Sequence, residues 1–145
     1  MSGTMQLERL YQEVGALIGI GGLRPDAQGC CRLVFDTTLL VEIRHAPAAR
    51  QLVLSCALGA DVRGDQALLV LRANAWGAGS AGGWFAVDER HQAMLQAALP
   101  LDGLEPTMLL AAVEKLLDAV ETWRARLRQA AVAQPPRMAD LMQRI

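Results

Sequence analysis

This sequence has few aromatic residues, no long apolar run and no large excess of charge of either sign. Aromatic residues make up only 4% of it, so a core must be built mainly from Leu, Val and Ala. No apolar run approaches the roughly 20 residues that a membrane helix requires, because charges interrupt each candidate. The N-terminus also lacks a basic region followed by an apolar stretch, so no secretory signal is predicted. We therefore expect a cytoplasmic protein without membrane insertion.

The charges are nearly balanced. Lys and Arg number 14 against 15 Asp and Glu, which gives a formal net charge of −1. Such a balance creates no field to attract nucleic acid or an anionic membrane. The one basic cluster, Arg124, Arg126 and Arg128, is best interpreted as a solvated helix end that complements the helix dipole. No nucleic-acid partner is predicted.

Cysteine and histidine are also few. Of the three cysteines, Cys30 and Cys31 are adjacent, which makes a poor disulfide framework, so reduced thiols are expected. No C-x-x-C or H-x-x-x-H spacing indicates a metal site. We predict no catalytic, metal or cofactor residues. The alternative is a small thiol-dependent enzyme, in which a cysteine (Cys56 included) pairs with His45 or His91 as its base.

The segment Gly77 to Gly82 matches the dinucleotide-binding pattern G-x-G-x-x-G letter for letter. That motif requires a strand before it and a helix after it. Here a helix precedes it and a strand follows, so no helix N-terminus would be available to hold a pyrophosphate. A flexible loop is the better interpretation.

Residues 28–58 show the clearest local pattern. Three successive runs alternate apolar and other residues with a period of two, and short connections at 36–38 and 46–48 join them. This predicts an antiparallel meander with one buried face. A helix before it is predicted by apolar residues at helical spacing, ending at Gly19. That stripe consists of Leu7, Leu10, Val14 and Leu17, with Tyr11 and Ile18 alongside.

The second half of the chain predicts further elements. Asp61 is expected to cap a second helix that runs to about Trp76. Strands are expected at 84–87 and 94–99, and Pro106 suits the first position of a long third helix. The order α-β-β-β-α-β-β-α predicts an α+β sandwich, an antiparallel sheet with its helices packed on one face. Residues 1–133 would form this domain. Pro135 and Pro136 would begin a C-terminal tail, 134–145, in which Met138, Leu141, Met142 and Ile145 have helical spacing.

The outward face of the meander is unusually apolar. Val34, Leu40, Val53 and Ala57 share it with a few charged residues. If helices cover only the other face, these side chains remain partly exposed, and such patches usually mark a partner site. A second subunit or the tail could cover them instead.

Several segments together resemble the class I type III secretion chaperones, the Tir chaperone family of small bacterial proteins. The matching pieces have the family's order and spacing over roughly residues 5–128. They are Leu17-Ile18-Gly19-Ile20, Gly29-Cys30-Cys31-Arg32-Leu33, Val41-Glu42-Ile43, Leu69 to Trp76 around Asn74, Gly83 to Asp88, Leu99-Pro100-Leu101-Asp102, and Leu116 to Leu127 with Glu121 and Trp123.

This resemblance implies a bacterial cytoplasmic homodimer, without enzymatic activity or cofactor, that holds the N-terminal region of a secreted effector in extended form. It places the effector contacts in the first helix and the meander, at Leu7, Leu10, Val14, Val34, Leu40 and Val53. It places the dimer contact on the second helix, at Leu68, Leu71, Arg72, Ala75 and Trp76.

The chain departs from the family in two respects. Family members are typically acidic, whereas this chain is nearly neutral, and the 134–145 tail lies outside the resemblance. An adaptor or regulatory binding module of the secretion system is an alternative function that would use the same dimer.

Overall fold

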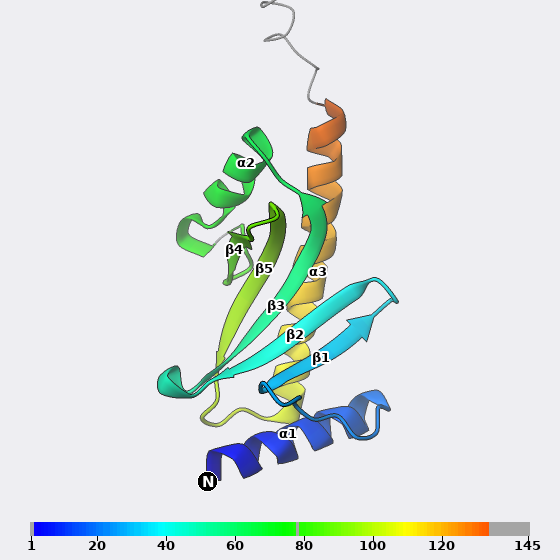
Figure 1. Cartoon of the computed structure of the whole chain (residues 1–145), viewed down its shortest axis with the longest axis vertical. Coiled ribbons are helices and arrows are strands. Elements are labelled where there is room, and N and C mark those ends of the chain that lie inside the picture. Colours follow the sequence, from blue (N-terminus) through cyan, green and yellow to red (C-terminus); the bar gives the residue numbers. More distant parts are fainter. Residues whose placement is uncertain (1, 78, 134–145) are drawn as a thin grey trace, which may run out of the picture.

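A five-stranded antiparallel sheet organises the chain, with the strand order β1-β2-β3-β5-β4. The computed structural model describes residues 2–77 and 79–133; the predicted tail, 134–145, lies outside these residues. The elements are α1 (Ser2–Ile18), β1 (Cys30–Phe35), β2 (Leu39–Ala46), β3 (Gln51–Asp61), α2 (Asp65–Ala73), β4 (Trp84–Val87), β5 (Gln92–Pro100) and α3 (Pro106–Ala133), with short 3-10 turns η1 (Pro47–Ala49) and η2 (Ala75–Gly77) (Figure 1). This order confirms the predicted α+β fold.

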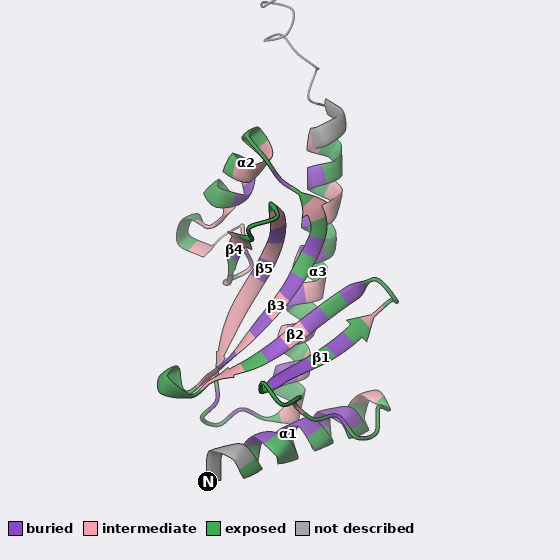
Figure 2. Ribbon diagram, in the orientation of Figure 1, coloured by how far each residue is buried: buried purple, intermediate pink, exposed green. Residues whose placement is uncertain are grey.

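Alternation along the strands divides the sheet into a buried face and an exposed face (Figure 2). Apolar residues at every second position, such as Val41, Ile43 and Leu54, are fully buried on the face toward the helices. Their neighbours in the sequence point to the other face, because successive side chains of a strand alternate. The predicted meander is therefore confirmed, and its helices lie on one face only.

The long helix α3 runs along the buried face and packs against β3 and β5. Apolar residues recur along this helix at spacings of three and four, and all of them are buried: Leu109, Val113, Leu116, Val120, Trp123 and Leu127. Each such side chain contributes about 1.5–3 kcal/mol by leaving water. Helix α1 crosses the lower end of α3 and buries its own stripe against the same core.

The second helix is shorter than predicted at both ends. Asp61 does not cap it: this residue is the last of β3, where it pairs with Gln92 beyond an irregularity in the β3–β5 register. The helix instead begins at Asp65 after Gly64, whose φ of 56° places it in the left-handed region and whose missing side chain offers no cap. It ends at Ala73, and Trp76 lies beyond it in η2, with φ 59°. Asp61 therefore extends β3 by pairing with β5 and does not serve as the N-cap of α2.

The glycine-rich segment after α2 is packed rather than free. The indole Nε1 of Trp123 donates a hydrogen bond of 2.8 Å to the carbonyl oxygen of Gly79. A Cβ at Gly79 would lie 2.9 Å from the Cβ of Ala73, and one at Gly83 would lie 2.0 Å from the carbonyl oxygen of Gln96. The glycines thus allow the chain to pass close to α2 and β5. The strand β4 follows the segment, as predicted, in place of the helix that the dinucleotide-binding motif requires.

Candidate protein-interaction surfaces

The sheet face that points away from the helices, here called the open face, carries exposed apolar groups. Val34 on β1 and Leu40 on β2 are register partners and are 62% and 40% exposed. Val53 lies on the same face of β3, opposite Arg44, and is half-buried. Three of the predicted effector contacts therefore share one surface, with Val34 and Leu40 adjacent across the β1–β2 pair.

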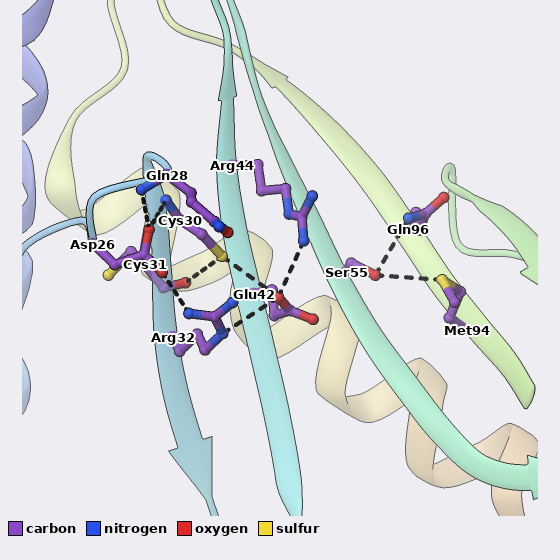
Figure 3. Close-up of polar contacts among 10 residues, drawn as sticks. All are labelled: Asp26, Gln28, Cys30, Cys31, Arg32, Glu42, Arg44, Ser55, Met94 and Gln96. Carbon is purple, nitrogen blue, oxygen red and sulfur yellow. Dashed lines mark hydrogen bonds and ion pairs between the residues drawn. The ribbon is translucent and has the colours of Figure 1, made fainter. Parts of the chain in front are cut away.

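A polar network borders this apolar patch (Figure 3). Glu42 lies between two arginines: its Oε2 is 3.5 Å from Arg32 Nε and 3.5 Å from Arg44 Nη2. Arg32 also pairs with Asp26 in the loop before β1. Exposed pairs of this kind contribute only about 0–1 kcal/mol each. They hold the arginine side chains across β1 and β2, and so limit where an incoming chain can approach the open face.

A second polar chain crosses the other half of the open face. Gln96 on β5 accepts a hydrogen bond of 2.8 Å from Trp84 Nε1 and donates one of 3.3 Å to Ser55 Oγ. Ser55 in turn contacts the sulfur of Met94 at 3.8 Å (Figure 3). These bonds link β4, β5 and β3 through side chains, whereas the half around Val34 is linked by ion pairs.

The outer edge of the sheet at β1 is partly closed by Asp26. Its carboxylate accepts hydrogen bonds from the N–H groups of Gln28 and Cys30, at 2.8 and 3.0 Å, and its own N–H donates to the Cys30 carbonyl at 2.9 Å. These two backbone donors, followed by Arg32, hold the pKa of Asp26 below its ordinary value. Both outward-facing backbone groups of Cys30 are thereby satisfied.

The rest of the β1 edge is open. Backbone groups of a strand point alternately to its two sides, so Arg32 and Val34 direct their N–H and C=O outward as Cys30 does. Among the described residues, no backbone partner occupies these groups. An added strand could therefore pair with β1 at Arg32 and Val34, beside the exposed Val34 and Leu40 side chains. The importance of Asp26 was not predicted, although an Asp three residues before a glycine at a strand entry is a typical turn signal.

Helix α1 contributes differently from the meander. Leu7, Leu10 and Val14 are buried in the core and offer little surface in the single chain. Leu7 nevertheless lines a pocket of about 180 Å³ between α1 and the loop before β1. The pocket wall is completed by Glu8, Tyr11, Pro25, Gly29 and His45. Leu10 and Val14 do not line it, so of the three predicted α1 contacts only Leu7 lies beside this pocket.

The residues predicted for the dimer contact form an exposed surface, here called the α2 face. Leu68, Leu71, Arg72, Ala75 and Trp76 are all exposed. Leu71 is 64% exposed and the Trp76 side chain is completely exposed. A large apolar side chain left in water loses roughly 1.5–3 kcal/mol relative to a buried one. The α2 face is therefore a strong candidate for burial by another protein.

The thiols are poorly suited to nucleophilic chemistry. Burial raises the pKa of both Cys31 and Cys56 to about 11. Burial, together with a hydrogen bond to Glu42, also raises the pKa of Cys30. Within residues 2–77 and 79–133, no thiol is hydrogen-bonded to a histidine. The same residues contain no group of His, Cys, Asp and Glu able to hold a metal ion, and no helix long and apolar enough to cross a membrane.

Comparisons with a family model and with solved structures point to one family of proteins. The sequence model of the Tir chaperone protein (CesT) family matches residues 9–124. A search of curated protein sequences gives no significant match. Among solved structures, the ExsC–ExsE complex contains a chain that is 26% identical, with a TM-score of 0.75 over 86% of this chain and 95% of the matched one.

Two further structures share the fold at lower identity. The HopA1–SchA chaperone–effector complex matches with 21% identity and a TM-score of 0.73, covering 86% of this chain and 98% of the other. The Yersinia pestis type III secretion chaperone SycH, in complex with a fragment of YscM2, matches with 20% identity and a TM-score of 0.68, over 81% and 98% of the two chains.

Proposed function

The chain belongs to the Tir chaperone protein (CesT) family, and from this membership we propose that it is a type III secretion chaperone. It binds the N-terminal region of an effector in extended form and keeps that region soluble and competent for secretion. Among the structures that share its fold, HopA1–SchA is a chaperone–effector complex, and SycH is a type III secretion chaperone in complex with a fragment of YscM2. The chaperone acts in the bacterial cytoplasm, without enzymatic activity or cofactor.

The observation that carries the proposal is the open part of the β1 edge. It combines unpaired backbone groups at Arg32 and Val34 with the apolar Val34 and Leu40 side chains on the adjoining open face. Main-chain hydrogen bonds to such an edge give affinity for any extended segment, and the neighbouring apolar groups select alternate side chains. An extended effector segment with an apolar residue at every second position fits this arrangement.

The α2 face supports the second part of the proposal, a homodimer. It gathers the exposed Leu68 and Leu71 with the completely exposed Trp76, all of them large apolar groups outside the sheet surface. Two copies joined there would cover them and would present two β1 edges to one effector chain. Linking two binding sites in this way raises the overall affinity without new contacts, because the second binding event becomes intramolecular.

The alternative of a thiol-dependent enzyme has less support. A thiolate is the reactive form of cysteine, and burial holds all three thiols in the neutral form at physiological pH. No observation on the described residues favours an adaptor role over the chaperone role.

The decisive experiment separates the backbone of Val34 from its side chain. Val34→Pro removes an N–H that faces away from β2, so no hydrogen bond within the sheet is lost, and edge strands tolerate proline at such positions. Val34→Ala is the matched control, because it shortens the side chain and keeps the N–H. Each variant is co-purified with the N-terminal segment of a type III effector from the same bacterium.

We expect Val34→Ala to retain most effector binding and Val34→Pro to lose it, with both variants folded by circular dichroism. Loss of one donor to a neutral acceptor alone corresponds to a roughly 2- to 12-fold weaker complex, and the proline ring adds a steric block. If Val34→Pro binds the effector as well as Val34→Ala does, strand addition at β1 is wrong.

A further inference from the structure

The edge of the sheet at β4 is closed by a side chain. Asn74, which follows α2, accepts a hydrogen bond at Oδ1 from the N–H of Phe85 and donates one of 3.1 Å from Nδ2 to the Phe85 carbonyl. One amide side chain thus supplies one acceptor and one donor to the same residue, which is the pattern that a residue of a neighbouring antiparallel strand would supply. Both outward-facing backbone groups of Phe85 are satisfied.

Asn74 is held in position to do this. Its own N–H donates to the carbonyl of Leu71 at 3.2 Å, and its carbonyl accepts from the N–H of Gly77 at 3.0 Å. Phe85 is fixed from the other side, because its ring packs edge-on against Trp123 with 4.9 Å between centroids. Neither partner can turn away without breaking contacts with α2 or the core.

The two edges of the sheet therefore differ in kind. At β1, Asp26 closes only the first position and leaves Arg32 and Val34 open. At β4, Asn74 closes the central position of a strand of only four residues. The N–H of Asp88 donates to Gln92 on β5, so alternation leaves only Val87 with outward-facing groups at the end of the strand. A single remaining position is too short to pair with a strand.

We propose that Asn74 is the residue that decides which edge of this protein accepts a strand: it closes the β4 edge against the strand of a second copy. Unprotected strand edges pair readily with one another, and native proteins cover them for that reason. The inference builds on the proposed strand addition at β1. If the β1 edge is kept open for an effector strand, the β4 edge must be closed, so that the β4 edges of two copies do not pair. Contact between copies at this end of the molecule is then left to the side chains of the α2 face.

The test opens the edge and then closes it by other means. Asn74→Ala frees both Phe85 groups, and the full-length variant is compared with the wild type by light scattering over a range of micromolar concentrations, without effector. We expect its average mass to rise with concentration beyond that of the wild type, by at least about twofold, since pairing through a new edge adds whole copies.

The rescue variant is Asn74→Ala combined with Val87→Pro. Proline removes the outward N–H of Val87, two residues after Phe85, and its ring obstructs a neighbouring strand without restoring any contact of Asn74. We expect this double variant to return to the wild-type mass, which a purely structural role for Asn74 would not produce. If the alanine variant does not fold, Asn74→Asp is measured instead. Aspartate keeps the acceptor for the Phe85 N–H and frees only the Phe85 carbonyl.

Two results would overturn the proposal. A folded Asn74 variant with the wild-type mass at every concentration would show that the β4 edge needs no closure. Self-association that persists after Val87→Pro would show that it does not arise from a strand paired along β4 from Phe85 to Val87. Neither result depends on effector binding, so a failure here is distinct from a failure of strand addition at β1.

Discussion

Replacing Tyr11 by phenylalanine is expected to stabilise this protein. Tyr11 is the only tyrosine of the chain and is 1% exposed, on the inner side of α1. Within the described residues its hydroxyl has no hydrogen-bond partner. A buried polar group without a partner has lost its hydrogen bonds to water and gained none in return. Phenylalanine keeps the ring in the core and removes only the oxygen.

The size of the effect follows from this geometry. An unsatisfied buried hydroxyl costs about 1–3 kcal/mol, and the variant leaves only a small void, so a gain of about 1 kcal/mol is expected. For a chain of 145 residues, the entropy of unfolding is about 0.3 kcal/mol/K, so the midpoint of thermal unfolding should rise by about 3 °C. Tyr11→Leu is the control: it removes ring volume from the core as well as the oxygen and should lower the midpoint.

The pH dependence provides an independent check. Burial, and to a lesser extent the neighbouring Cys31 and Cys30, raises the pKa of Tyr11 above its ordinary value of 10. Above pH 10 the unfolded chain releases the phenol proton while the folded chain keeps it, so the wild type loses stability as the pH rises. Phenylalanine has no such proton, and the stability difference between variant and wild type should therefore widen above pH 10.

Thermal unfolding followed by circular dichroism at neutral pH and above pH 10 measures both effects. A midpoint for Tyr11→Phe that is lower than that of the wild type by more than about 2 °C would refute the reasoning, because it would mean that the hydroxyl has a stabilising partner. A stability difference that stays constant above pH 10 would show that the phenol is not buried in the folded chain.

Three further predictions follow from the packing. Gly83→Ala should lower stability by about 2 kcal/mol or more, because its Cβ would lie 2.0 Å from a backbone oxygen of β5, whereas Gly21→Ala, with open space around it, should be nearly neutral in denaturant unfolding. Leu10→Asp should prevent folding, since it buries a carboxylate, whereas Val53→Asp on the open face should fold and lose effector binding in co-purification. Cys56, with a pKa of about 11, should resist alkylation at pH 8 until the chain unfolds, because only about one thiol in a thousand is ionised.

Each of these has a clear contrary result. Equal stability of the two glycine variants would show that β4 and β5 can separate at no cost. A folded Leu10→Asp variant would remove this residue from the core. Alkylation of native Cys56 as fast as that of a free thiol would show that the strand opens, and would reopen the question of thiol chemistry.

The fold could be predicted because its signals are local and repeated. Alternation in residues 28–58 and the spacing of three and four in α3 both report a buried face directly, since burial repeats with the period of the element. The family resemblance rested on the same segments. The long helix and all five strands were therefore predicted within a few residues, and the matching family confirmed the assignment.

Other features depended on contacts between distant segments. Asp61 looked like a helix cap, but pairing with Gln92, 31 residues later, made it part of β3. Leu10 and Val14 were expected to contact an effector. An apolar stripe on a helix has the same spacing whether it packs against the core or against a partner protein. In the single chain both residues are buried in the core. Val34 and Leu40, by contrast, are exposed because no helix covers their side of the sheet.

The sequence by itself determined the elements, their order and the nearly neutral charge of the chain, because composition and periodicity can be read directly from the residues. Only the tertiary structure decided which backbone groups remain open. Asp26 lies four residues from the Cys30 groups it satisfies, and Asn74 lies eleven from those of Phe85. A strand edge is closed when a side chain from another segment hydrogen-bonds to its backbone groups. The periodicity of the sequence predicts which face of an element is buried, but it does not predict such a contact.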